Sequence, residues 1–356
     1  MNSNPLGILP GLLLSLLLAG SGVYLADLVG VTWMGLPKTP VSPIMMAILL
    51  GILLRNSLGL PAIFQAGVAF SLKRVLRFGI VLLGIRLSVM EAGEIGVKAL
   101  PVIIACVSVA LLLVTWLSKR LGLSSRLGTL IAAGTGICGA TAIVALSPSI
   151  HARENETCYA VACVTLFGVA AMLVYPFAAH WLFAGDAFLA GLFLGTSVHE
   201  TAQVAGAGLV YQQYFGQAEA LNVATVTKLV RNLGMLVVIP LLSILYHRQS
   251  ETGDDRPGGW SIFPVFIAGF ALMSLLRTVG DMGERPFGVL SPELWGSFIA
   301  GVKQLAEISL GIAMAAVGLG TQLSQLRVIG LKPLGVGLFS ALLVGAVSYA
   351  LIRLLY

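Results

Sequence analysis

The sequence predicts an all-α polytopic membrane protein with about eleven transmembrane helices, and its composition is the first evidence for that fold class. Hydrophobic residues make up 58% of the 356 residues and charged residues only 10%, whereas a soluble domain carries about 25% charged residues. Apolar runs long enough to span a bilayer core, roughly 20 residues each, follow one another almost from end to end. Two glycine- and threonine-rich motifs that echo each other are a third observation, because they predict breaks within helices.

The apolar runs divide the chain into helices joined by short connections. We place them at residues 6–29, 41–59, 71–90, 99–118, 127–148, 157–183, 187–211, 220–246, 260–279, 296–321 and 333–355. We interpret residues 1–356 as a single transmembrane transporter domain, with an extra N-terminal helix within 1–36 and a polar loop at 247–260. The first run lacks a Lys/Arg-rich start, so we expect a membrane anchor rather than a cleaved signal peptide.

Basic residues determine the expected topology. Lys and Arg are more numerous in the loops that face the cytoplasm when the N-terminus is placed there, which is the usual bias of membrane proteins. We therefore expect a multi-pass protein of the cell inner membrane with a cytoplasmic N-terminus. The net charge of +6 is spread over loops instead of forming one basic patch, so we expect no nucleic-acid partner.

Two internal echoes predict inverted repeats. The stretch GTGICGATAIVA (134–145) resembles GTSVHETAQVAG (195–206), and GIRLSVMEAGEIGVKAL (84–100) resembles GTQLSQLRVIGLKPL (320–334). The second pair lies an odd number of predicted helices apart, which gives its copies opposite orientations in the membrane, as in many secondary transporters. Glycine and hydroxyl residues are dense enough in the first pair to interrupt a helix. We therefore expect two broken helices that cross near the membrane midplane.

The two Gly-Thr segments are the main candidate for a binding site. Small residues in membrane helices often serve only close packing, but here they gather with hydroxyl side chains at the expected breaks. The N-terminal ends of broken helices carry partial positive charge and free backbone N–H groups that suit anions. From these segments we expect the substrate to contact Gly134, Thr135, Gly136, Gly139, Thr141, Gly195, Thr196, Ser197 and Thr201.

A basic face in the run VATVTKLVRNLGMLVVIPLL (223–242) is the second candidate. Lys228, Arg231 and Asn232 are spaced i, i+3 and i+4, which places them on one side of a helix. Charged residues within a membrane helix are costly and usually functional, although near a helix end they can instead extend to the lipid headgroups. We expect these three residues to bind an anionic substrate, since guanidinium and ammonium groups both suit oxyanions.

His199 and Glu200 stand side by side in the second Gly-Thr segment and allow three interpretations. We reject the first, a zinc-peptidase HExxH motif, because Gln203 occupies the position of the second histidine. The second is a proton-coupling or gating role, since both side chains can exchange a proton. In the third, Glu200 forms a structural ion pair with Lys228 or Arg231.

Lys303 and Glu307 form a further charged pair in the run FIAGVKQLAEISLGIAM (298–314). Their i, i+4 spacing fits a structural ion pair. Such pairing lowers the free energy of a charge in a membrane helix. A coupling or gating role is the alternative.

Three motifs together, GTGICGATAIVALSPSI, GTSVHETAQVAGAG and VTKLVRNLGMLVVIPLL, give the sequence a family resemblance. From about Gly35 to the C-terminus, the chain resembles the YeiH-type bacterial inner-membrane proteins, also known as the sulfate exporter family. The resemblance implies a polytopic inner-membrane protein that exports sulfate or related sulfur oxyanions. It supplies no binding residues, so the site residues above rest on the sequence itself.

These observations predict a secondary transporter that moves a small anion, of the sulfate, sulfite or sulfonate kind, across the inner membrane with proton coupling. An anion channel and a cation/proton antiporter of related fold are the alternatives. We expect no enzyme, because Walker A, dinucleotide-binding and nucleophile–base motifs are missing from the sequence. We expect no metal or cofactor, because the four cysteines follow no ligand spacing. The expected partners are the small anionic substrate, the lipid bilayer and further copies of the chain in a homo-oligomer.

Overall fold

The computed structural model describes residues 5–33, 42–247, 265–282, 285–324 and 330–356, and within these ranges it contains helices and no strand. Six of the described helices are long and apolar enough to cross a bilayer: Gly7–Asp27, Val89–Arg120, Glu154–Leu182, Ala218–Tyr246, Pro292–Gly320 and Leu331–Leu355. Shorter apolar helices lie between them. The predicted class, an all-α polytopic membrane protein, is confirmed. The predicted polar loop at 247–260 lies outside the described residues, apart from its first residue.

The helices group into two compact units, where the sequence predicts a single domain. Unit 1 comprises residues 1–94, 208–222 and 265–323, and unit 2 comprises residues 95–207, 223–264 and 324–356. The chain passes between the units at residues 94/95, 207/208, 222/223, 264/265 and 323/324, and the first three of these boundaries fall inside the helices Val89–Val109, Thr201–Phe215 and Ala218–Leu233. No change in composition therefore marks the division in the sequence.

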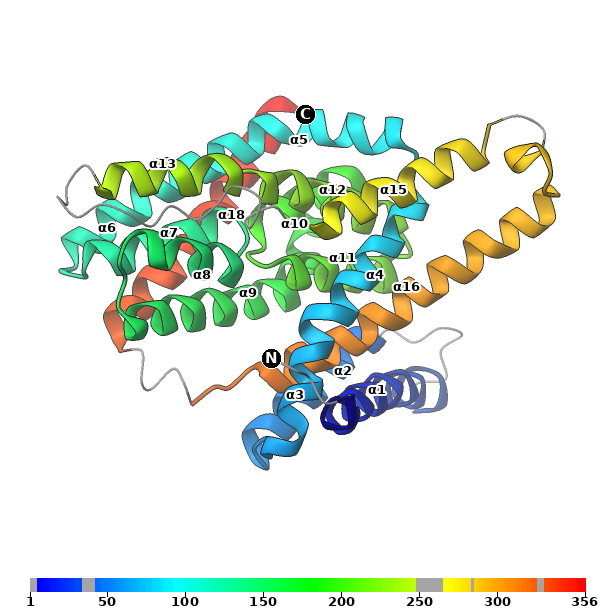
Figure 1. Ribbon diagram of the computed structural model, residues 1–356, viewed down its shortest axis with the longest axis horizontal. Coiled ribbons are helices and arrows are strands. Elements are labelled where there is room, and N and C mark those ends of the chain that lie inside the picture. Colours follow the sequence, from blue (N-terminus) through cyan, green and yellow to red (C-terminus); the bar gives the residue numbers. More distant parts are fainter. Residues whose placement is uncertain (1–4, 34–41, 248–264, 283–284, 325–329) are drawn as a thin grey trace. The chain divides into compact units, whose positions relative to one another are not determined.

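Unit 1 is built around the long helix α16. Its helices are α1 (Pro5–Asp27), α2 (Pro43–Ser57), α3 (Ala62–Phe70), α4 (Leu76–Leu83), α15 (Val265–Gly280) and α16 (Pro292–Gly320). Helix α16 packs against α2 and α4, α1 crosses α3, and α15 lies on α4 (Figure 1). Serine side chains cap α2 and α16, where Ser42 accepts from Met45 N and Ser291 accepts from Leu294 N.

One helix of unit 1 begins earlier than the sequence predicts. The segment expected at 71–90 starts at Ala62, because α3 continues through a π-helical turn, Ser71–Val75, directly into α4. Lys73 and Arg74 lie inside this continuous helix, at the start of the predicted segment 71–90. A π-turn keeps the backbone hydrogen bonded while it shifts the helical register, so the two charges do not end the helix.

Two glycines set the distance between α1 and α3. A Cβ atom on Gly11 would lie 2.1 Å from the carbonyl oxygen of Phe64, and one on Gly67 would lie 2.1 Å from that of Ile8. Both approaches involve backbone atoms, which cannot move aside as a side chain can. The α1–α3 contact therefore requires glycine on both helices, as in other close membrane-helix crossings.

We expect Gly67→Ala to separate α1 from α3 and to lower the stability of the protein by about 1–3 kcal/mol, the usual effect of overpacking. The measurement is the thermal unfolding of purified protein in detergent. Gly7→Ala is the matched control, because Gly7 lies on α1 with nothing within 4 Å of its Cβ position. Equal unfolding temperatures for the two variants would show that the close contact is not required.

Unit 2 contains the broken helices. The helices in this part of the chain are α5 (Val89–Val109), α6 (Thr115–Arg120), α7 (Ser125–Gly136), α8 (Ala140–Ser149), α9 (Glu154–Leu182), α10 (Ala187–Ser197), α11 (Thr201–Phe215), α12 (Ala218–Leu233), α13 (Met235–His247) and α18 (Leu331–Leu355). Helices α5, α11 and α12 also contribute residues to unit 1. Within unit 2, α9 packs against α7, α8, α10 and α18 (Figure 1).

Candidate functional site

Two helices of unit 2 are interrupted at the predicted Gly-Thr segments. Helix α7 ends at Gly136 and α8 begins at Ala140. Helix α10 ends at Ser197 and α11 begins at Thr201. The two predicted breaks are confirmed, and the echo between 134–145 and 195–206 therefore marks a shared local structure.

Lys228 of α12 joins the two breaks. Its side chain is fully buried, and its Nζ donates to the carbonyl oxygen of Ile137 at 3.0 Å, to that of Val198 at 3.0 Å, and to that of His199. An ammonium group has three hydrogens, so all of them are used. Because one acceptor lies in the first break and two lie in the second, a single ammonium brings the breaks together.

Arg231, one turn further along α12, makes contacts of the same kind and is also fully buried. Its Nε donates to the carbonyl oxygen of Gly136 at 2.6 Å, and its Nη2 donates to that of Thr135. Its Nη1 donates to the carbonyl oxygens of Thr196, at 2.7 Å, and Val198, at 3.2 Å. The guanidinium therefore binds the last turns of both α7 and α10.

These contacts cap the C-terminal ends of two helices. The last carbonyls of a helix have no partner inside it and carry partial negative charge. At the first break, Gly139 N donates to the oxygen of Gly134, and the basic side chains satisfy the carbonyls of the next three residues. The sequence predicts Lys228 and Arg231 as substrate ligands, but their contacts assign them to helix ends. Extension to the lipid headgroups is wrong for both, because neither is exposed.

Glu200 has the complementary position at the start of α8. Its Oε1 accepts from the backbone N–H of Ala140 at 3.1 Å and from the Thr165 hydroxyl at 3.5 Å. A carboxylate there stabilises the partly positive N-terminal end of α8. Among the described residues, Glu200 forms no ion pair with Lys228 or Arg231, so the predicted structural pairing is replaced by this helix-end contact.

The HExxQ sequence works as a helix start. The backbone N–H of Glu200 donates to Gln203 Oε1 at 3.1 Å, and Gln203 Nε2 donates to the carbonyl oxygen of Thr165 at 3.0 Å. A glutamine three residues into a helix that binds the N–H before the helix is one half of a capping box. Gln203, which the sequence excludes as a metal ligand, therefore begins α11.

Helix α18 contacts both broken helices through two serines that the sequence analysis missed. Ser340 Oγ lies 3.2 Å from Thr135 Oγ1, and Ser348 Oγ lies 2.6 Å from Thr196 Oγ1. The two threonine hydroxyls, predicted as substrate donors, are thus engaged within the protein. A signal was present, because both serines belong to Gly-x-x-Ser patterns eight residues apart at 337–340 and 345–348.

The other predicted residues have separate roles. Gly134 and Gly195 serve close packing, since a Cβ atom would lie 2.7 Å from Ile143 Cδ1 and 2.6 Å from Thr227 Cβ respectively, whereas Gly136 ends α7 and Gly139 has a φ of +70°. Thr141 is exposed and does not join the buried breaks. Asn232 Nδ2 donates to Thr201 Oγ1 at 3.0 Å, which ties α12 to the start of α11. Of the predicted hydroxyls, only Ser197 is both buried and without a partner.

A further set of polar atoms around the second break has no hydrogen-bond partner. They are Ser197 Oγ, both ring nitrogens of His199, Thr227 Oγ1 and Asn232 Oδ1. Their residues are at most 2% exposed. Thr227 was not singled out in the sequence, because a threonine in an apolar helix carries no signal of its own. The proton-coupling or gating role of His199 and Glu200 stays a prediction.

In unit 1, the predicted ion pair between Lys303 and Glu307 is wrong. Glu307 Oε1 accepts from Arg86 Nη2 at 2.5 Å and from Gln212 Nε2 at 3.0 Å, and Arg86 Nη1 donates to Gln212 Oε1 at 3.0 Å. The described residues include no ion pair between Glu307 and Lys303. The Arg86 side chain is only 6% exposed, and a buried guanidinium requires a counter-charge.

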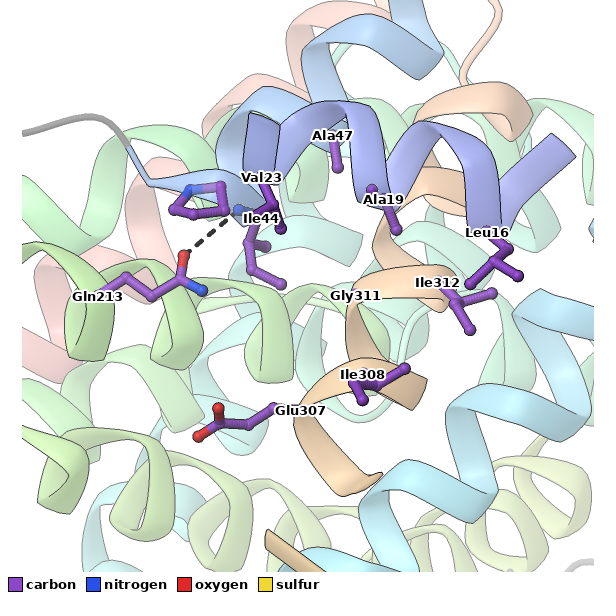
Figure 2. Close-up of a pocket in the computed structure, with 12 residues that line it drawn as sticks. Leu16, Ala19, Val23, Ile44, Ala47, Gln213, Glu307, Ile308, Gly311 and Ile312 are labelled. Atoms are coloured by element: carbon purple, nitrogen blue, oxygen red, sulfur yellow. Dashed lines mark hydrogen bonds between the residues drawn. The ribbon is translucent and has the colours of Figure 1, made fainter. Parts of the chain in front are cut away.

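A cavity of about 330 Å³ lies beside Glu307 in unit 1, among α1, α2, α11 and α16. Figure 2 shows apolar side chains such as Leu16 and Ile312 along its walls, with Gln213 and Glu307 as the polar groups. Gln213 Oε1 accepts from the backbone N–H of Ile44 at 3.3 Å. Of the predicted site residues, Glu307 alone lines this cavity.

Known proteins support a membrane family. A family model described as "Conserved hypothetical protein 698" matches residues 10–337. The chain is 31% identical over 348 residues to a UPF0324 membrane protein of Bacillus cereus, and the aligned region covers 97% of this chain and 94% of the relative. It is 32% identical over 336 residues to a UPF0324 membrane protein of Pseudomonas putida, covering 93% and 89% respectively. No solved structure matches the chain.

The match to the family model extends over most of the chain and includes both helix breaks and the basic face of α12. A third relative, a UPF0324 membrane protein of Streptococcus agalactiae, is 30% identical over 333 residues and covers 92% of each chain. Such coverage leaves no large part of the fold without a counterpart. The chain therefore belongs to the family of multi-pass membrane proteins described as conserved hypothetical protein 698.

Proposed function

We propose that the protein is a secondary transporter that moves a small anion across the inner membrane. The observation that carries the proposal is the buried charge at the paired breaks. Two cations, Lys228 and Arg231, lie beside one carboxylate, Glu200, so the ionised site holds a net charge of +1. A buried excess of positive charge in a membrane protein favours an anion and repels a cation.

The paired breaks also fit transport. Secondary transporters commonly place their substrate sites at discontinuous helices, where partly charged helix ends meet. This comparison is an analogy between folds. The resemblance to YeiH-type proteins supports a sulfate, sulfite or sulfonate-like anion. The distribution of Lys and Arg supports a cytoplasmic N-terminus, and the missing catalytic motifs support a non-enzymatic role. All of these belong to the proposal.

Glu200 provides a route for proton coupling. When its carboxylate binds a proton, the net charge of the site rises from +1 to +2 and its attraction for an anion increases. Loss of the proton reverses this change. Anion and proton would therefore bind together, and a pH gradient would drive the anion.

The test is uptake of labelled sulfate, sulfite and a small sulfonate into proteoliposomes that contain the full-length protein. We expect uptake that saturates with concentration and increases several-fold when a pH gradient is imposed. In Glu200→Gln the charge no longer depends on pH, so uptake is expected to lose most of its response to the gradient. Glu154→Gln, at an exposed residue of α9, is the matched control and should respond like the wild type.

Two results would contradict the proposal. Anion flux that follows the membrane potential without saturation would indicate a channel. Sodium/proton exchange without any anion flux would indicate an antiporter, in spite of the positive charge of the site.

A further inference from the structure

The second break contains more unsatisfied polar groups than its structural role requires. Ser197, His199 and Thr227 are fully buried, and Asn232 is 2% exposed. Each has at least one polar atom with no hydrogen-bond partner, and both ring nitrogens of His199 are unpartnered. Buried polar groups are nearly always hydrogen bonded, and exceptions of this kind commonly mark a bound ion, water or ligand.

These four side chains, which we name the polar quartet, surround one break. Ser197 is the last residue of α10, and His199 lies in the break itself. Thr227 packs against Gly195, where a Cβ atom would lie 2.6 Å from the Thr227 Cβ. Asn232 binds Thr201 at the start of α11. Helix α12 thus passes along the break, and its two quartet residues are separated by about 7.5 Å of helical rise.

The neighbouring cations have few hydrogens left for a ligand. Lys228 donates all three of its hydrogens to backbone carbonyls. Arg231 makes four further hydrogen bonds to backbone carbonyls. Their charge still acts on the surroundings. Direct hydrogen bonds to a bound molecule therefore fall to the neutral side chains beside them.

We propose that the polar quartet is the anion-binding site, and that Lys228 and Arg231 hold the two breaks together and supply the positive field. The hydroxyls of Ser197 and Thr227 and an N–H of His199 act as donors to the oxygen atoms of the anion. Asn232 joins them when its amide is turned, because the Thr201 hydroxyl then donates to Oδ1 and Nδ2 is free. This proposal rests on the proposed anion transport.

The chemistry of the quartet alone would also suit a sodium ion, since hydroxyl and amide oxygens are common ligands of hard cations. The two buried positive charges decide between these possibilities. A cation would be placed beside Lys228 and Arg231, whereas Glu200, the one carboxylate near them in the described part of the chain, is already bound to the start of α8. The positive electrostatic potential of Lys228 and Arg231 therefore favours an anion, and the donors of the quartet favour one with several acceptor oxygens.

Replacement of quartet hydroxyls by apolar groups of the same shape gives a specific signature. Removing an unsatisfied buried polar group leaves stability unchanged or raises it, while removing a ligand contact weakens binding. For Ser197→Ala and Thr227→Val we therefore expect an unfolding temperature no lower than that of the wild type. We expect sulfate to bind at least tenfold more weakly. Ser149→Ala is the matched control, because Ser149 Oγ is also buried and unpartnered but ends α8.

The measurement is the shift of the unfolding temperature of the full-length protein during titration with sodium sulfate, choline sulfate and sodium chloride, together with the KM of sulfate uptake in proteoliposomes. Stabilisation by both sulfate salts that is weakened only in the quartet variants supports the site. If the wild type takes up sulfate and both quartet variants bind it normally, the quartet assignment is overturned while anion transport stands. Stabilisation that follows sodium would overturn the anion assignment, and an absence of anion binding and uptake in the wild type would overturn both proposals.

Discussion

Arg231→Met is expected to prevent the stable assembly of unit 2. Methionine is unbranched, as arginine is, but it has no donor, so the carbonyls of Thr135, Gly136 and Thr196 lose their hydrogen-bond partner. A buried polar group without a partner costs about 1–3 kcal/mol. Three such groups therefore remove a large part of a total stability of about 5–15 kcal/mol. The loss of positive charge between two helix C-terminal ends adds to this effect.

The measurement is the monodisperse fraction after detergent extraction, followed by the unfolding temperature of the recovered protein. Arg231→Lys retains the charge but has fewer donors in a different geometry, so we expect an intermediate loss. Arg353→Met, at an exposed residue near the end of α18, is the matched control and should behave like the wild type. A fully stable Arg231→Met protein would show that the guanidinium does not hold the helix ends together.

Gly139→Ala is expected to have the second largest effect. Gly139 has φ +70° and ψ −134° at the start of α8, a conformation that side chains oppose. A Cβ atom there would lie 2.1 Å from Cγ of Glu200. Backbone strain of about 1–3 kcal/mol and a comparable overpacking term act together, and they displace the carboxylate from Ala140 N.

Two further variants separate strain from steric overlap. Gly122→Ala introduces a side chain at φ +73° with nothing within 4 Å, so it measures the strain alone. The double variant Gly139→Ala with Glu200→Ala removes the overlap and should recover part of the lost stability. Unfolding temperatures in detergent provide the comparison. If Gly139→Ala were no worse than Gly122→Ala, the contact with Glu200 would not limit this position.

Patterns along the chain predicted much of the fold. Apolar runs located the membrane helices. The echoing Gly-Thr segments located both breaks, because the glycines and hydroxyl residues that favour a break lie within a few residues of it. The spacing of Lys228, Arg231 and Asn232 also placed them correctly on one helix. These are local properties, which a single sequence expresses directly.

Partners across helices could not be predicted in this way. The acceptors of Lys228 and Arg231 are backbone carbonyls, which every residue possesses and no residue type reveals. Glu307 has Lys303 at the favourable helical spacing, yet Arg86, from a distant part of the sequence, binds it instead. The polar quartet could not be predicted either, because only the folded structure shows whether a buried polar atom has a hydrogen-bond partner.

The position of Arg231 in the chain also sets the order in which the two breaks and their capping residue are synthesised. Its carbonyl partner Gly136 precedes it by 95 residues, and Thr196 precedes it by 35 residues. Both broken helices are therefore synthesised before the residue that caps their C-terminal ends. Until α12 has been added, the last carbonyls of α7 and α10 lack the donors that they have in the folded protein. The paired breaks can therefore reach their final hydrogen bonding only after all three segments, α7, α10 and α12, are present.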